Sequence, residues 1–321
     1  MLKSIFLITF IISCSFSVIA APTNTWDSYW ATRWQKKAEN GDNDAQFNLG
    51  LLYYEGTGVP QDYEKALYWF EKAAIQDHTQ AQFNLGLMFY EGIGATQNFE
   101  TARHWFEKAA AKKDAAAECN LGVIYAEGQG VKKNYATAKQ WYERAAAQGN
   151  AQAQWNLGVL YYKGQAVPLD FSMAAYWFEK SALQNNPEAQ FLLGMLYYEG
   201  QGVPQNDTLA SQWFLEAALQ NHGPAQFNIG VMLLKGQGIE QNDYLALEWL
   251  EKAALQGEIE AMMLTAHLYN EGIGTPKNLN AALYWYEKAA IFGDPEALEK
   301  SKALKTLLDS SLVESESDSG M

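Results

Sequence analysis

The chain has 321 residues, of which 48% are hydrophobic and 14% aromatic, and its formal net charge is −14. A disordered chain would be less hydrophobic and more densely charged, so this composition indicates a folded protein. The acidic balance argues against nucleic acid as a partner, because phosphate backbones are bound by clusters of Lys and Arg. The 11 Trp residues are many for this length, and their spacing is the first clue to the fold.

Residues 1–20 predict a secretory signal peptide. Lys3 precedes an apolar stretch, and Val18-Ile19-Ala20 offers a cleavage site, so the mature chain would begin at Ala21. Two alternatives remain open. The stretch could stay as a membrane anchor, although it is slightly shorter than the roughly 20 residues of a membrane span, or Cys14 could be lipidated, since the residues before it resemble a lipobox. We expect an exported protein, periplasmic or secreted.

Cleavage would remove Cys14 and leave Cys119 as the single cysteine. One cysteine excludes an internal disulfide. In other copies of the repeat described next, the position of Cys119 holds Phe, Trp or Met. We therefore interpret Cys119 as a small buried hydrophobic residue.

A repeat of 36 residues fills most of the chain. The hexapeptide AQFNLG at residue 45 recurs, with variations, at every 36th residue up to residue 261. One such unit cannot bury its own apolar face, so the units are expected to stack. The seven predicted units are 45–80, 81–116, 117–152, 153–188, 189–224, 225–260 and 261–296, and each contains a Trp at the same position: Trp69, Trp105, Trp141, Trp177, Trp213, Trp249 and Trp285.

Each unit predicts two helices, called helix A and helix B. In the first unit, apolar residues at helical spacing place helix A at about residues 45–54, ending at Gly56. Asp62, whose position is always Asp or Asn, is the predicted N-cap of a helix B that runs to about residue 75. Ala66, which is Ala in every copy, predicts a close helix contact. Gly50, inside helix A, predicts close approach of a bulky ring, and we expect that ring to be the Trp69-type side chain.

The flanking segments predict caps for the stack. Residues 26–44 resemble an isolated helix B with its loop, and we predict an N-terminal capping helix in the segment 21–44. Residues 297–308 restart a helix A with more Lys and Glu, which is typical of a solvent-facing C-terminal capping helix. Residues 309–321 are acidic and small, so they predict a disordered tail.

The unit A-x-x-x-L-G-x-x-Y-x-x-G-x-G-V-x-x-D-x-x-x-A-x-x-W-F-x-x-A-A resembles the Sel-1-like repeat, a relative of the tetratricopeptide repeat. All seven units carry it, with local departures such as Ala166 in place of the Gly58-type glycine and Thr265-Ala266 in place of Leu-Gly. The resemblance implies an all-α, right-handed α-solenoid that acts as a protein-interaction scaffold in bacterial envelope, signalling or host-contact roles. A secreted branch linked to β-lactam binding or hydrolysis has a disulfide in each repeat, which this chain cannot form.

No catalytic motif is present in the sequence. It contains no G-x-S-x-G elbow, no phosphate-binding G-x-x-x-x-G-K-[ST] loop and no H-E-x-x-H metal pair. The Gly pairs of the repeats follow a helix rather than a strand, which excludes a Rossmann loop. The four His residues are interpreted as scattered surface residues: His78, His104, His222 and His267. We expect no enzyme activity, no cofactor and no metal.

The candidate binding residues lie on helix A, which would line a concave groove if the tetratricopeptide resemblance holds. Tyr beside Glu at the end of helix A suits an interaction surface, because Tyr contributes a large area at low entropy cost. An alternative is that Phe47-type positions belong to the core between repeats and that only Tyr54-type positions reach solvent. The predicted residues are Tyr54, Glu55, Tyr90, Glu91, Trp155, Tyr162, Tyr198 and Glu199.

The favoured hypothesis is an exported, non-enzymatic scaffold that binds a protein or peptide in this groove, as a monomer without a membrane span once the signal is removed. The alternative is an envelope protein that binds or hydrolyses cell-wall peptides or β-lactams, for which the support is family analogy alone. A virulence factor that binds host proteins is a third possibility, because the sequence does not distinguish a host partner from an envelope partner.

Overall fold

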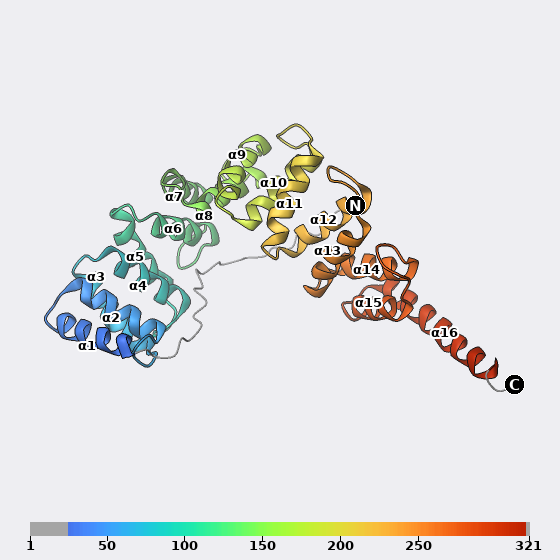
Figure 1. Cartoon of the computed structure of the whole chain (residues 1–321). Coiled ribbons are helices and arrows are strands. Elements are labelled where there is room, and N and C mark those ends of the chain that lie inside the picture. Colours follow the sequence, from blue (N-terminus) through green and yellow to red (C-terminus); the bar gives the residue numbers. More distant parts are fainter. Residues whose placement is uncertain (1–24, 319–321) are drawn as a thin grey trace. The chain divides into compact units, whose positions relative to one another are not determined.

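The computed structural model describes residues 25–318, and over this range the chain is entirely helical, without a strand (Figure 1). The all-α solenoid prediction is therefore confirmed. The helices form two compact units, and the division falls in the chain between Asn134 and Tyr135. The predicted signal segment 1–20 lies outside the described residues.

Unit 1 consists of a leading helix followed by A and B helices in alternation, each packed on the next in chain order. The leading helix confirms a helix within residues 21–44, and its Ala38 packs against Ala45 and Leu49 of the first helix A. The helices of unit 1 are α1 (Thr25–Glu39), α2 (Asn43–Glu55), α3 (Tyr63–Ile75), α4 (Thr79–Glu91), α5 (Phe99–Ala111) and α6 (Ala115–Glu127).

Unit 2 continues the same alternation and ends on a longer helix. Here too each helix packs on the one that follows it in the chain, so that its core is built from successive neighbours. The helices of unit 2 are α7 (Tyr135–Ala147), α8 (Ala151–Lys163), α9 (Phe171–Ala182), α10 (Pro187–Glu199), α11 (Asp207–Leu219), α12 (Gly223–Lys235), α13 (Asp243–Leu255), α14 (Ile259–Glu271), α15 (Leu279–Ile291) and α16 (Pro295–Asp318).

Side-chain caps set the start of most of these helices. The Asp62 carboxylate accepts a hydrogen bond from the Lys65 N–H at 3.0 Å, as predicted for the start of helix B. Helix A begins two residues earlier than predicted, because its N-cap is Asp42, which accepts from the Ala45 N–H at 2.8 Å. At the other end, Gly56 adopts φ 74° and donates to the Leu52 carbonyl, which confirms the predicted end of helix A.

The glycine inside helix A makes room for a ring of helix B, but the ring is not the predicted Trp. A Cβ added to Gly50 would lie 2.6 Å from the Phe70 ring, and the same holds at Gly158, where Phe178 would be 2.5 Å away. Phe70 is 1% exposed. Trp69, one residue earlier, packs instead into the cluster that Ala45 and Leu49 of α2 form with Ala38 of the leading helix. The prediction that the Trp69 ring lies against Gly50 is therefore wrong by one residue, which corresponds to about 100° of rotation around helix B.

A ladder of glutamines joins successive helices at a buried position that the sequence analysis did not single out. The Gln190 amide donates to the Ala182 carbonyl at 3.2 Å, and its Oε1 accepts from Gln220 at 2.7 Å. Gln46, Gln154 and Gln226 are bonded in the same way. In the last repeat Met262 and Phe292 occupy the two Gln positions, so both partners of the polar pair change to apolar residues, which leaves no unpaired amide.

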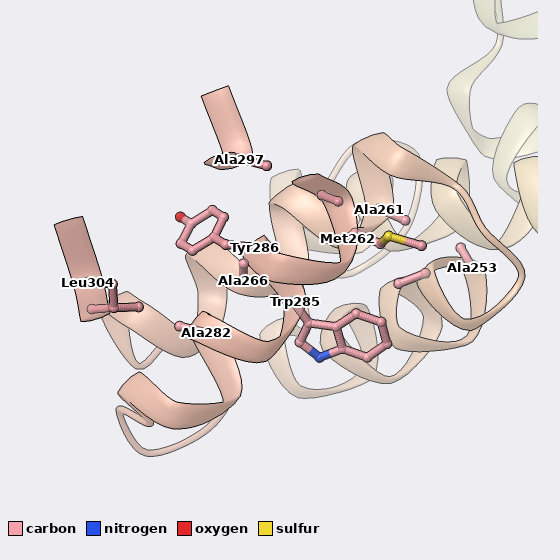
Figure 2. Close-up of a cluster of buried hydrophobic side chains, with 11 residues drawn as sticks. Ala253, Ala261, Met262, Ala266, Ala282, Trp285, Tyr286, Ala297 and Leu304 are labelled. Carbon is pink, nitrogen blue, oxygen red and sulfur yellow. The ribbon is translucent and has the colours of Figure 1, made fainter. Parts of the chain in front are cut away.

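The last core cluster of unit 2 shows how the stack ends (Figure 2). Ala297 and Leu304 of α16 pack with Tyr286 of α15, so a packed helix occupies the region 297–308 where a C-terminal capping helix was predicted. Lys302 stands where a further helix A would have its Gly50-type glycine. The Lys302 side chain is exposed, so this position of α16 is not packed against a ring as Gly50 is against Phe70.

The prediction of a disordered tail from residue 309 is wrong for residues 309–318, because α16 continues to Asp318. The segment after Leu308 contains no Gly or Pro before Gly320, so nothing in it breaks a helix that is already anchored by its first turns. α16 also begins earlier than the predicted 297, because Asp294 caps it by accepting from the Ala297 N–H at 2.7 Å.

Candidate partner-binding surface

The structure places four of the predicted residues at the C-terminal ends of α2 and α4 in unit 1. Tyr54 is half-buried, and its ring packs edge-to-face on Tyr63 with 5.4 Å between centroids. Glu55 is exposed, and the neighbouring Glu91 is partly buried. Burial raises the pKa of the Tyr54 hydroxyl, and the carboxylate of Glu91 adds to that shift. Tyr54 and the carboxylate of the following repeat therefore belong to one surface.

Tyr90 was predicted to reach solvent, but its side chain is buried and only 4% exposed. Its ring packs edge-to-face on Phe99 at 5.4 Å and contacts Phe106 at 6.4 Å. Burial raises the pKa of its hydroxyl, the neighbouring Gln129 side chain opposes that shift, and Glu127 and Glu91 add to it; among the described residues no group completes a well-aligned hydrogen bond with the hydroxyl. Tyr90 is thus a core residue whose polar end faces the carboxylates at the helix ends.

The other four predicted residues lie on α8 and α10 in unit 2. Tyr162 and Tyr198 are half-buried and Glu199 is exposed, as expected for a contact surface. The Tyr162 ring packs edge-to-face on Phe171 at 5.4 Å; burial raises its pKa, and Glu199 adds to the shift. The Tyr–Glu arrangement of unit 1 is therefore repeated here.

Trp155, which was predicted to line the groove, is partly buried. It packs against the cluster around Phe178, and its indole Nε1 is buried without a partner. Phe47, at the equivalent position of the first repeat, packs on Phe70 at 5.8 Å and stacks on His78 at 4.4 Å. Both side chains are therefore partly buried and pack on core residues, and the alternative interpretation of the sequence placed Phe47-type positions in the core.

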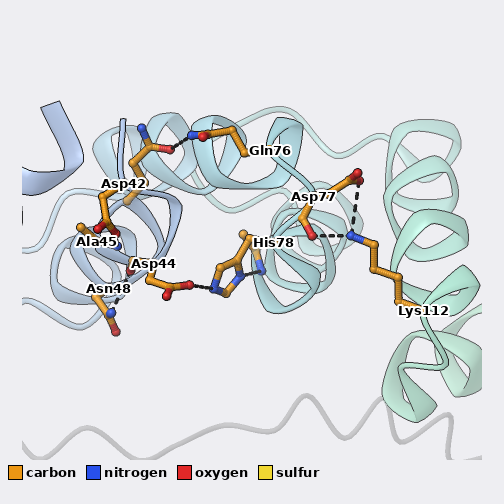
Figure 3. Close-up of polar contacts among 10 residues, drawn as sticks. Asp42, Asp44, Ala45, Asn48, Gln76, Asp77, His78 and Lys112 are labelled. Atoms are coloured by element: carbon orange, nitrogen blue, oxygen red, sulfur yellow. Dashed lines mark hydrogen bonds and ion pairs between the residues drawn. The ribbon is translucent and has the colours of Figure 1, made fainter. Parts of the chain in front are cut away.

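Two histidines that the sequence analysis interpreted as scattered surface residues are helix caps. The Nδ1 atom of His78 accepts from the Ala81 N–H at 3.2 Å, and its Nε2 lies 3.4 Å from Asp44 of the preceding helix A (Figure 3). His222 repeats this arrangement with Ala225 and Glu188. The sequence did carry a signal, because the same repeat position holds Asp or Asn in four other copies: Asp42, Asp114, Asn150 and Asn186.

We expect acid to weaken the start of α4 through His78. Burial lowers the pKa of His78, Asp44 opposes that shift and Lys112 adds to it. A His with a lowered folded-state pKa contributes stability that is complete above the unfolded value of about 6.5 and is lost as the pH falls through the folded value. Protonation places a hydrogen on Nδ1 and removes the cap, which costs about 1 kcal/mol.

The measurement is the free energy of unfolding in urea at about pH 7.5 and pH 5. The carboxylates of the chain also titrate, so the comparison is made with His78→Asn, whose amide oxygen can cap at either pH. The wild type should lose more stability than the variant between the two pH values. Equal losses would contradict the assignment.

A row of exposed aliphatic side chains in unit 2 was also missed. Leu183, Leu219, Leu255 and Ile291 are between 64% and 79% exposed and occupy the same repeat position, at the end of α9, α11, α13 and α15 or immediately after it. The signal was their 36-residue spacing. Because these residues follow helix B and not helix A, the row is distinct from the Tyr–Glu surface and provides a control for it.

Other features of the described residues lie apart from this surface. A pocket of about 400 Å³ is lined by residues of α1 and the turn after it, and none of the eight predicted residues contributes to it. Between residues 25 and 318 there is no group of three or more His, Cys, Asp or Glu side chains placed to hold a metal ion. No helix in that range is both long and apolar enough to cross a membrane.

The chain is similar to two solved structures over most of its length. One is a protective antigen of uropathogenic Escherichia coli strains that displays an SLR fold, with 33% identity, a TM-score of 0.66, and coverage of 87% of this chain and 68% of that chain. The other is a Sel1 repeat protein from Oxalobacter formigenes, with 31% identity, a TM-score of 0.71, and coverage of 85% and 80%. A search of curated proteins found no significant match.

The family model of the Sel1 repeat matches seven successive segments, 43–78, 79–114, 115–150, 151–186, 187–222, 223–258 and 259–291. These segments start two residues before the predicted units and coincide with the observed starts of the A helices. Proteins built from this repeat are generally protein-interaction scaffolds. With seven matched repeats that contain fourteen of its helices, this chain belongs to the Sel1 repeat family.

Proposed function

We propose that this protein is an exported, non-enzymatic scaffold that binds a protein or peptide through the ends of its A helices. The observation that carries the proposal is the repeated pairing of a partly exposed Tyr with a carboxylate: Tyr54 with Glu55 and Glu91 in unit 1, and Tyr162 and Tyr198 with Glu199 in unit 2.

Such pairs have the properties of a contact surface. A half-buried Tyr is held in place by its neighbour, as Tyr54 is by Tyr63 and Tyr162 by Phe171. It therefore loses little conformational entropy when a partner covers the rest of its ring. Interface energy is commonly concentrated in a few aromatic anchors of this kind. The general role of the family as interaction scaffolds supports the same conclusion.

The proposed location is the periplasm or the outside of the cell. Lys3 followed by an apolar segment that ends at Ala20 supports cleavage by a signal peptidase. The similar Escherichia coli protein is described as a protective antigen, which supports a role in envelope or host-contact processes. Fractionation of cells, with the N-terminus of the mature chain sequenced, tests this: a start at Ala21 is expected, and an intact residue 1 in the cytoplasm would contradict it.

The binding surface is tested by cross-linking pull-down from envelope extracts with the triple variant Tyr54→Ala/Tyr162→Ala/Tyr198→Ala. We expect loss of most of the partners captured by the wild type, because each anchor costs about 1–2 kcal/mol or more when truncated. Tyr90 is left unchanged because it is buried.

The matched control removes three exposed Tyr residues from B helices: Tyr68, Tyr176 and Tyr284, which are 50%, 47% and 47% exposed. This control should capture the same partners as the wild type. Undiminished capture by the Tyr54/Tyr162/Tyr198 variant would disprove the assignment. Loss of capture in a Leu219→Ser/Leu255→Ser variant instead would move the contact to the aliphatic row of unit 2.

A further inference from the structure

The three A helices of unit 1 all end on a carboxylate. Glu55, Glu91 and Glu127 are the last residues of α2, α4 and α6, and none of these helices has a basic residue in its last turn. The C-terminal end of a helix carries a partial negative charge, which favours cations and disfavours Glu. The charge placement is therefore unfavourable for the folded chain alone, and it occurs three times in succession.

Unit 2 does not share this feature. At the equivalent position, α8 ends on Lys163 and α12 ends on Lys235, whereas α10 and α14 end on Glu. Cations thus alternate with carboxylates in unit 2 and are missing from this position in unit 1. The uniformly acidic row is a property of unit 1 and not of the repeat as such.

The three carboxylates have no cationic partner among the described residues. Neither Glu55, Glu91 nor Glu127 forms an ion pair, although other acidic side chains of unit 1 do, such as Asp77 with Lys112 and Glu107 with Arg103. Burial raises the pKa of Glu91, as expected for a carboxylate that is partly withdrawn from water without a compensating positive charge.

A second observation at the same place is independent of the charges. The Tyr90 hydroxyl, which is close enough to Glu91 and Glu127 to feel their charge, belongs to a side chain that is only 4% exposed, and it has no well-aligned hydrogen-bond partner within residues 25–318. Gln129 lies beside this hydroxyl, and its Oε1 is also buried and unpaired. Buried polar atoms without partners are uncommon in folded proteins. Both atoms can accept a hydrogen bond, which is what a bound ammonium or guanidinium group would supply.

We propose that the acidic row of unit 1 (Glu55, Glu91 and Glu127) binds a basic, Lys- or Arg-rich segment of a partner protein. This inference rests on the proposed function and specifies the chemistry of the partner. Each cationic side chain would meet a carboxylate and the negative end of a helix together, and the half-exposed ring of Tyr54 offers an aromatic face to the same cations.

The test is the affinity of the full chain for a nona-lysine peptide, measured by fluorescence anisotropy with a labelled peptide. Wild-type binding should weaken on going from about 0.02 M to about 0.15 M salt. In the variant Glu55→Gln/Glu91→Gln/Glu127→Gln we expect affinity to fall by about tenfold or more. The melting temperature of this variant should stay equal to or rise above that of the wild type, because Gln removes the unfavourable charge at three helix ends.

The matched control is Glu64→Gln/Glu71→Gln/Glu100→Gln, which makes the same change in net charge with exposed carboxylates of α3 and α5. It should weaken binding by less than about twofold, because these charges are screened at a distance. Equal losses in the two variants, or no binding of nona-lysine by the wild type, would overturn the inference. If partners are nonetheless captured in the Tyr-dependent manner described above, the proposed function stands and only the basic character of the partner is wrong.

Discussion

Replacing Phe178 by Ala should destabilise the protein by about 3–5 kcal/mol, the largest single-residue effect expected in unit 2. The Phe178 side chain is 0% exposed and lies against Gly158 of α8 with no room for a Cβ between them. Because Gly158 has no side chain, it cannot move into the space that the ring leaves, so the cavity should remain open. The loss of stability should therefore lie toward the upper end of the range.

The measurement is urea unfolding followed by helical circular dichroism. Tyr176→Ala provides the control, because Tyr176 lies two residues earlier on the same helix and is 47% exposed. Removing the Tyr176 side chain should lower the free energy of unfolding by less than about 1 kcal/mol, since little of its surface is buried. If the two variants lose similar stability, Phe178 does not form the contact that the structure assigns to it.

Gly238→Ala should lower the free energy of unfolding by about 2–5 kcal/mol. This loss is the sum of a steric contribution, from the clash of the added Cβ, and a conformational contribution, from the positive φ. Gly238 adopts φ +68°, which side chains rarely adopt, and an added Cβ would lie 2.1 Å from the carbonyl oxygen of Asp207 at the start of α11. The obstacle is backbone and cannot rotate away. The loop and the preceding helix B would have to separate.

Gly257→Ala distinguishes the two terms. Gly257 has φ +97°, but an added Cβ would meet only Phe292 Cε1 at 4.0 Å, so the conformational cost remains and the steric cost disappears. The Gly257 variant should therefore be the more stable of the two. Ala166, which holds the Gly238-type position in the fourth repeat at φ +62°, offers the converse test. Ala166→Gly should raise stability by about 1 kcal/mol, and a loss would contradict the strain argument.

Part of the candidate surface followed from the sequence alone. Tyr54, Tyr162 and Tyr198 are half-buried as a contact surface requires, and Glu55 and Glu199 are exposed. Helical spacing predicted which residues share a face of helix A. Helical spacing did not predict the burial of Tyr90. Tyr54 and Tyr90 have the same place in the repeat, yet Tyr90 is only 4% exposed. That difference arises from its packing on Phe99 and Phe106, which no pattern within one helix specifies.

The sequence by itself determined the all-α class, the 36-residue unit and the ends of most helices, because these depend on signals within one repeat: the Asp62-type cap, the Gly56-type turn and the apolar spacing between them. Only the tertiary structure decided which ring lies on Gly50, that the His78 imidazole lies beside Asp44 of the preceding helix A, and that Tyr90 is buried. The physical reason is that each of these contacts joins two helices, so its geometry depends on how one helix is rotated against the next. A shift of one residue, from Trp69 to Phe70, turns a side chain by about 100° and sends it to a different neighbour.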